Sequence, residues 1–376
     1  MQASDDAVVA AAAAAAARTA SSAEERILNL QLRKIVKENH LAPVEMLQYH
    51  PKESNRHMLA SVGASLVSIY DNSHCGGHLD LSCVLQNVET EYAKGGTLSC
   101  LAWLQQPENW ENEALLAFAG ESGEVSVMSV AHCRVVGLFK GHTSAVKDLE
   151  AHPCLPGVVV SVADDQTARV WNGLQEHDYA TREQELRPAC LAVFDIGTDV
   201  PSSIACNAAI DSLEFIDENR VAVLDARGRL VVQNISDSEP LSVMSVPHSS
   251  DPTIRADYTN HRRTRFGISS CRRFIGCGNN WGEVYVFDIE KAAQIHMIGM
   301  PRIRSPVTSC AFIRDCSSVA IATSDSILWR WDAVTPEQIL VESDVLAASP
   351  RATTKTEDLK SSSDSSGPEA MIVDAA

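Results

Sequence analysis

Apolar and polar residues alternate along much of the chain in short segments joined by tight turns. In each of six units, a run of small and apolar residues leads into a turn with Gly, Asp or Ser, and a second alternating segment follows. Period-two alternation bounded by turn residues predicts β-hairpins. The units are Met58–Tyr70, Leu115–Met128, Val158–Trp171, Val221–Gln233, Phe274–Phe287 and Val319–Trp331.

These hairpins recur along the chain with steps of 58, 43, 62, 54 and 44 residues between their last residues, and further alternating segments such as 99–103 and 308–312 precede them. Met128 and Trp171 are 43 residues apart, and Phe287 and Trp331 are 44 apart. Four strands in a repeat of roughly 40 to 45 residues predict the blades of a WD40 β-propeller. We therefore expect an all-β fold with six recognisable blades, or seven if a degenerate blade lies within residues 172–210.

Composition changes at both ends of the chain suggest the domain boundaries. Residues 1–23 are Ala-rich and predicted to be disordered, and residues 345–376 form a polar tail that is also predicted to be disordered. Residues 41–344 then form the propeller. Residues 24–40 are either a helix or the strand that closes the ring, and the alternation of Leu28–Arg33 favours the strand.

One unit carries the polar residues of a complete WD repeat. Gly141-His142 precedes Trp171 by the spacing of such a repeat, so we expect His142, Ser161, Asp165 and Trp171 to form a buried hydrogen-bonded chain. A Ser, a His and an Asp could also suggest a hydrolase. The spacing favours the structural role.

Charge and motifs narrow the function further. Lys and Arg number 31 against 49 Asp and Glu, which gives a net charge of −18. This charge disfavours direct nucleic-acid binding and permits basic partners such as histone tails. No apolar run is long enough for a membrane helix. We find no phosphate-binding loop or H-E-x-x-H motif, and we predict no enzyme, no metal and no cofactor.

The cysteines are predicted to be reduced and buried, as in a cytosolic or nuclear protein. There are 11 of them, without a CxxC pair. His74, Cys75, His78 and Cys83 form the tightest cluster of metal-ligand types. Their spacing fits no common zinc pattern, so a loop is favoured over a zinc site.

Several segments resemble one WD-repeat family, that of embryonic ectoderm development and extra sex combs. They are Ala60–Gly63, Gly141–Leu149 with His152-Pro153, Gly278–Glu290, and Ser326–Asp332 with its W-R-W-D ending. The resemblance covers about residues 30–334. It implies a non-catalytic, nuclear scaffold of Polycomb repressive complex 2 that supports histone H3 methylation. The implied partners are a SET-domain methyltransferase of the E(z) type, the other subunits of that complex, and the H3 tail as a candidate.

The resemblance also implies an aromatic cage for trimethyl-lysine on one face of the propeller. Its four positions correspond to Pro43, Ser99, Arg262 and Arg263, and none of these residues is aromatic. We therefore expect the cage to be lost or relocated. The alternative is a shifted loop alignment, with Tyr49 or Tyr258 supplying rings.

Two further questions remain open from the sequence. The basic run His261–Arg265 fits a nuclear-localisation patch or a contact with an acidic partner, and it fits a solvated loop equally well. A different WD adaptor, such as a ubiquitin-ligase substrate receptor, is the alternative function. Such a receptor is expected to show W-D-x-R at the end of a blade, whereas Trp331-Asp332 is followed by Ala333-Val334.

Overall fold

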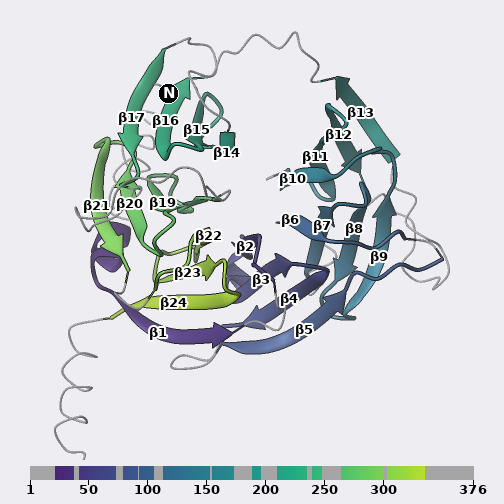
Figure 1. The fold of residues 1–376 in the computed structure, drawn as a ribbon, viewed down its shortest axis with the longest axis horizontal. Coiled ribbons are helices and arrows are strands. Elements are labelled where there is room, and N and C mark those ends of the chain that lie inside the picture. The colour runs from purple at the N-terminus through teal and green to yellow at the C-terminus, as the bar shows by residue number, and fades with distance from the viewer. Residues whose placement is uncertain are drawn as a thin grey trace, which may run out of the picture. The chain divides into compact units, whose positions relative to one another are not determined.

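The computed structural model describes residues 22–37, 42–72, 79–91, 93–105, 113–152, 155–172, 189–195, 210–234, 239–247, 264–299 and 303–334. Within these residues, 24 strands form six antiparallel sheets of four strands each, arranged as a six-bladed β-propeller (Figure 1). This confirms the predicted fold class. Residues 22–28 are helical, and Glu53–Asn55 form one 3-10 turn.

The first three sheets follow the chain order. They comprise β2 (Met46–Tyr49), β3 (Met58–Gly63), β4 (Leu66–Asp71) and β5 (Asp80–Gln86); β6 (Leu98–Trp103), β7 (Leu115–Gly120), β8 (Val125–Ser129) and β9 (Arg134–Phe139); and β10 (Val146–Ala151), β11 (Val158–Ala163), β12 (Thr167–Asn172) and β13 (Ala189–Asp195).

The other three sheets include the one that joins the two ends of the described chain. They comprise β14 (Ile210–Phe215), β15 (Arg220–Asp225), β16 (Arg229–Asn234) and β17 (Pro240–Ser245); β18 (Gly267–Ile268), β19 (Phe274–Gly278), β20 (Val284–Asp288) and β21 (Ala293–Ile298); and β22 (Val307–Phe312), β23 (Ser318–Thr323), β24 (Ile327–Ala333) and β1 (Leu30–Lys37).

The N-terminal strand completes the last sheet. β1 pairs antiparallel with β24, from Leu30 opposite Ala333 to Lys37 opposite Ile327, with one irregularity at Leu32/Lys34. Figure 1 shows β1 in purple beside the yellow-green β24. The pairing gives β24 a partner on its outer side, since an unpaired edge would expose its backbone N–H and C=O groups.

The segment between Asn172 and Ile210 contributes the strand β13 within its described part. β13 pairs along β12 from Asp195 opposite Thr167 to Ala189 opposite Asn172. It is therefore the fourth strand of the sheet β10–β13. Residues 173–188 and 196–209 lie outside the described residues.

The core is a ring of apolar clusters between neighbouring sheets. Fully buried side chains such as Trp103, Phe118, Trp171 and Phe274 fill the spaces between sheets. Polar contacts join the inner strands as well. The backbone N–H of Leu47 on β2 donates to Ser309 Oγ on β22 over 3.0 Å, and Trp103 Nε1 donates to the carbonyl of Gln48 over 3.0 Å. These contacts fix the inner strands against one another.

The structure corrects the expectation for two cysteines. Cys83 on β5 and Cys133, in the turn before β9, form a disulfide between neighbouring blades. The prediction of reduced thiols is therefore wrong for this pair. Their 50-residue separation conceals that the outer strands of two blades meet there. Cys83 is consequently not a thiolate ligand for a metal, and His74, Cys75 and His78 lie outside the described residues. Among the described cysteines, Cys100, Cys271, Cys277, Cys310 and Cys316 are thiols that take part in no disulfide.

Candidate binding sites of the propeller

The four WD-repeat residues are joined by hydrogen bonds in the structure. Asp165, in the turn between β11 and β12, contacts His142 Nδ1 through Oδ2 at 2.8 Å. His142 Nε2 lies 2.7 Å from Ser161 Oγ, which also accepts from Trp171 Nε1 over 2.8 Å. Because the indole is a donor only and the carboxylate an acceptor, Nδ1 carries the histidine proton and Ser161 donates to Nε2. The four side chains thus satisfy one another's hydrogen bonds, which suits a structural role.

Hydrogen bonding controls the charge of Asp165. Burial by itself raises the pKa of a carboxyl, but donation from Thr167, from the N–H of Thr143 and from His142 outweighs it and holds the pKa of Asp165 well below its usual range. The hydrogen bonds to the Asp165 carboxylate therefore stabilise the folded state fully above the pKa of this carboxyl in the unfolded chain, about 4. This stabilisation is lost progressively as the pH falls from there through the lower pKa of the folded state.

The last sheet contains a shorter version of this chain. Thr323 Oγ1 donates to Asp325 Oδ1 over 2.6 Å and accepts from Trp329 Nε1 over 3.0 Å. The bonded indole there is that of Trp329, and the rings of both Trp329 and Trp331 pack in the apolar core between sheets. Both tryptophans of the W-R-W-D ending thus have buried, structural positions.

Two of the four cage positions lie within the described residues. Pro43 precedes β2, and Ser99 is the second residue of β6, so both lie at the N-terminal ends of inner strands. Ser99 Oγ donates to the carbonyl of Val146 over 2.8 Å. Arg262 and Arg263 lie outside the described residues. The alternative ring donor Tyr49 is at the C-terminal end of β2, where its buried hydroxyl contacts Ser318, and Tyr258 is also outside the described residues.

A buried ion pair lies near these positions. Arg265, just before β18, is 6% exposed, and its Nη1 donates to Asp148 Oδ1 over 2.7 Å. Its Nη2 donates to the carbonyl of Lys147 over 2.8 Å and contacts that of Ser99 at 3.5 Å. Burial opposes the charge, yet the nearby Asp148 keeps the pKa of Arg265 above its usual value. The guanidinium joins β18, β10 and β6, so Arg265 is not part of a solvated basic patch.

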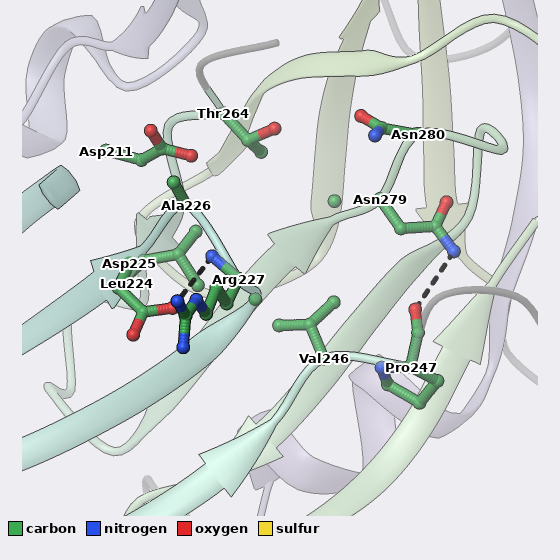
Figure 2. Close-up of a pocket in the computed structure, with 12 residues that line it drawn as sticks. Asp211, Leu224, Asp225, Ala226, Arg227, Val246, Pro247, Thr264, Asn279 and Asn280 are labelled. Atoms are coloured by element: carbon green, nitrogen blue, oxygen red, sulfur yellow. Dashed lines mark hydrogen bonds between the residues drawn. The ribbon is translucent and has the colours of Figure 1, made fainter. Parts of the chain in front are cut away.

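A small cavity of about 50 Å³ lies between the sheets β14–β17 and β18–β21, beside the N-terminal end of β14, and its lining residues are shown in Figure 2. Asp225 Oδ1 accepts the N–H groups of Arg227 and Arg229, each over 2.9 Å, whereas its Oδ2 is buried without a hydrogen-bond partner. Asp225 is the last residue of β15, close to the place that Asp165 has after β11, and the described contacts of Asp225 include no histidine. The cavity has room for a few waters, which would satisfy this oxygen.

A larger cavity of about 400 Å³ lies at the opposite ends of the inner strands. It is bounded by the C-terminal ends of β2, β6, β10, β18 and β22 and by Glu214 of β14. Aromatic rings and charged groups line it together: Tyr49, His50, Trp103, Glu150, His152, Glu214, Phe266, Arg272, Phe312 and Arg314. Concave, mostly apolar sites with a few convergent polar groups are typical of ligand binding. Sequence reasoning missed this cavity, because its lining residues come from strands far apart in the chain.

Two carboxyls in this cavity have perturbed protonation. Burial, and next the charge of Glu214, raise the pKa of Glu150 to about 8. Burial raises the pKa of Glu214 to about 7, against the opposing effect of Arg272, whose Nη1 lies 2.7 Å from Glu214 Oε1. His50 has the reverse shift: burial, and then Lys52, lower its pKa to about 4. Grouped, perturbed pKa values are frequent at functional sites.

The fold and these contacts define a WD-repeat β-propeller. No protein-family model matches the chain. Among curated proteins, it is 24% identical over 358 residues to the Polycomb protein esc of Drosophila melanogaster, covering 79% of this chain and 83% of that protein. It is 21% identical over 326 residues to the Polycomb group protein FIE2 of Zea mays, covering 74% and 84%. The Polycomb protein EED of Chaetomium thermophilum is 28% identical over 95 residues, or 25% and 16% of the two chains. The chain is thus similar to the Polycomb proteins named esc, EED and FIE, which supports the family resemblance seen in its sequence motifs.

Within the described residues, no helix is long and apolar enough to cross a membrane, and no group of three or more His, Cys, Asp or Glu side chains could hold a metal ion.

Proposed function

We propose that this protein is a non-catalytic scaffold subunit of a Polycomb repressive complex 2-like histone H3 lysine methyltransferase. The observation that carries the proposal is the similarity to esc over 79% of the chain and to FIE2 over 74%, combined with the six-bladed propeller. The propeller presents surfaces from many loops, which suits assembly. Its partner is a SET-domain methyltransferase of the E(z) type together with the other subunits of that complex, and its location is the nucleus.

Affinity purification of the full chain from its native nuclei, with mass spectrometry, tests the assembly. We expect a SET-domain methyltransferase to be recovered, because a scaffold subunit forms a lasting interface with its catalytic partner. Recovery of a cullin adaptor in its place contradicts the proposal and supports a ubiquitin-ligase receptor. A Trp171→Ala variant, expected to be destabilised, shows whether capture requires the folded propeller.

We further propose that the trimethyl-lysine cage of the family is lost in this chain. Two observations support this: Pro43 and Ser99 offer no ring face, and the other two positions are Arg262 and Arg263, whose charges would repel a methylated ammonium. Ser99 also has its hydroxyl and carbonyl engaged by Val146 and Arg265.

Titration of the full chain with an H3 tail peptide, trimethylated or unmodified, tests the loss. We expect the two peptides to bind with equal affinity to within about twofold, because no cage distinguishes them. Micromolar binding that requires the trimethyl group contradicts the loss. The acidic protein can attract both peptides through its charge, so the comparison between them is the deciding measurement.

A further inference from the structure

Two of the thiols that take part in no disulfide, Cys271 and Cys316, lie in adjoining turns of neighbouring sheets. Cys271 is in the turn between β18 and β19, and Cys316 is in the turn between β22 and β23. Ser270 Oγ donates to the carbonyl of Arg314, which joins the two turns directly. Cys316 belongs to the apolar cluster between these sheets, and Cys271 packs against that cluster.

The two sulfurs are in contact with each other. The thiol of Cys316 donates a hydrogen bond to the sulfur of Cys271, and Ser269 Oγ lies 3.2 Å from the same sulfur. The Cys316 thiol first, and Ser269 after it, outweigh burial and lower the pKa of Cys271 to about 6. The same contact, followed by burial, raises the pKa of Cys316. At neutral pH, Cys271 is therefore mostly a thiolate and Cys316 keeps its proton.

Solvent reaches one sulfur of the pair and not the other. Cys271 is half-buried, whereas Cys316 is 1% exposed. The other described thiols outside the disulfide, Cys100, Cys277 and Cys310, are buried as well. Redox-reactive cysteines are accessible thiolates beside a second thiol, because the thiolate is the nucleophile and the second thiol completes a disulfide. Cys271 and Cys316 have these two arrangements in one place.

We propose that Cys271 and Cys316 form a redox modification site that takes a hydroperoxide as its oxidant and closes into a disulfide between two blades. The Cys271 sulfur attacks one oxygen of hydrogen peroxide and the O–O bond breaks. Cys271 becomes a sulfenic acid, and the other oxygen leaves as hydroxide and is protonated to water. The Cys316 sulfur then attacks the sulfenic sulfur, and the hydroxyl group leaves with the Cys316 proton as a second water. The two cysteines lose two electrons, and one peroxide is reduced to two waters.

The disulfide would join the sheet β18–β21 to the last sheet, which β1 completes. It adds a covalent link where the hydrogen bond of Ser270 and the shared apolar cluster already hold the two turns together. A thiol reductant reverses it by thiol–disulfide exchange. The site depends on the contacts of two cysteines and is independent of the Polycomb assignment.

Peptide mapping after oxidation tests the disulfide. The full chain is treated with a small molar excess of hydrogen peroxide, blocked with N-ethylmaleimide in denaturant, and digested with trypsin without reduction. Trypsin places Cys271 in residues 266–272 and Cys316 in residues 315–330, apart from every other cysteine. We expect these two peptides to be recovered as one cross-linked species that dithiothreitol separates. Recovery of the two peptides without this cross-link overturns the proposal.

Substitutions at the two positions separate their roles. In Cys316→Ala, the sulfenic acid of Cys271 has no thiol to attack it, so we expect dimedone to label Cys271 and no cross-link to form. In Cys271→Ser, we expect oxidation of the buried Cys316 to fall at least tenfold. Equal oxidation of Cys316 with and without Cys271 contradicts the assigned order. Cys277, which is fully buried, is the internal control and should stay unoxidised in every sample. Thermal melts confirm that both variants fold.

The pH dependence of alkylation gives an independent readout. Short pulses of iodoacetamide label Cys271, and because its pKa is lowered to about 6, we expect the rate to reach half its plateau at about pH 6. Arg26 and Asp315 act on Cys316, and Arg273 is beside Cys271; the arginines stay charged and the pKa of Asp315 is lowered, so none of them titrates there. Cys316→Ala removes the main donor and should move the half-point upward. A half-point at about pH 8.5 in the unchanged chain, as for an ordinary cysteine, contradicts the reactive role of Cys271.

Discussion

Deleting residues 1–37, which removes β1, should prevent the chain from folding cooperatively. The deletion leaves the outer edge of β24 unpaired along its length. It also removes Ile27, which is fully buried, and Leu30 and Leu32, which pack on the core around Trp329. We expect a loss of about 5 kcal/mol or more, comparable to the whole stability of a typical domain. Urea unfolding followed by circular dichroism, with size-exclusion chromatography, measures the change.

Deletion of residues 1–21 is the control for this experiment. It ends before the first described residue and leaves β1 and Ile27 in place. We expect its unfolding midpoint to equal that of the full chain. If the two truncations unfold alike, pairing of β1 with β24 does not stabilise the propeller, and the ring is held by the other sheets.

Replacing Trp171 with Ala is the second change with a large expected effect. The side chain is 1% exposed, its ring lies 5.5 Å from that of Phe139 between centroids, and its indole N–H donates to Ser161. Truncation leaves a cavity in the core. It also removes the indole N–H that donates to Ser161 at the end of the Ser161–His142–Asp165 chain. Large aromatic-to-alanine changes in cores cost about 3–5 kcal/mol, and we expect a loss in that range by urea unfolding.

Trp171→Phe separates packing from hydrogen bonding. It retains most of the ring and removes the indole N–H, so we expect a loss well below that of Trp171→Ala. A smaller companion change, Ser161→Ala, leaves both the indole and His142 Nε2 unpaired and should cost about 1–3 kcal/mol. If Trp171→Ala lowers the free energy of unfolding by less than 1 kcal/mol, the hydrogen-bonded chain does not anchor its blade.

The local hairpins could be predicted from the sequence with good accuracy. The unit Leu115–Met128 is β7 and β8, and the unit Phe274–Phe287 is β19 and β20, each within a residue or two of the predicted limits. Alternation reveals these strands because one hairpin is a local structure, in which the two strands and their turn are contiguous in sequence.

The contacts that make the candidate binding site could not be predicted in this way. Arg265 meets Asp148 across 117 residues of sequence, and Arg272 meets Glu214 across 58. Neither spacing repeats, and both residues of each pair stand in unremarkable local patterns. The loss of the aromatic cage was inferred from residue types at four positions, and two of those positions lie outside the described residues, so it stays a prediction. The disulfide between Cys83 and Cys133 was missed for the same reason of distance.

The sequence by itself determined the repeated hairpins, the WD-repeat character and the resemblance to the esc and EED proteins, because these depend on residues close together in the chain. Only the tertiary structure decided how the ring is completed, since β1 and β24 come from opposite ends of the described chain. It also decided which charges are balanced. A carboxylate is paired or unpaired according to what the neighbouring blades bring to it, so Asp148 is neutralised by Arg265 while Glu150, two residues further along the same strand, faces an open cavity without a cation.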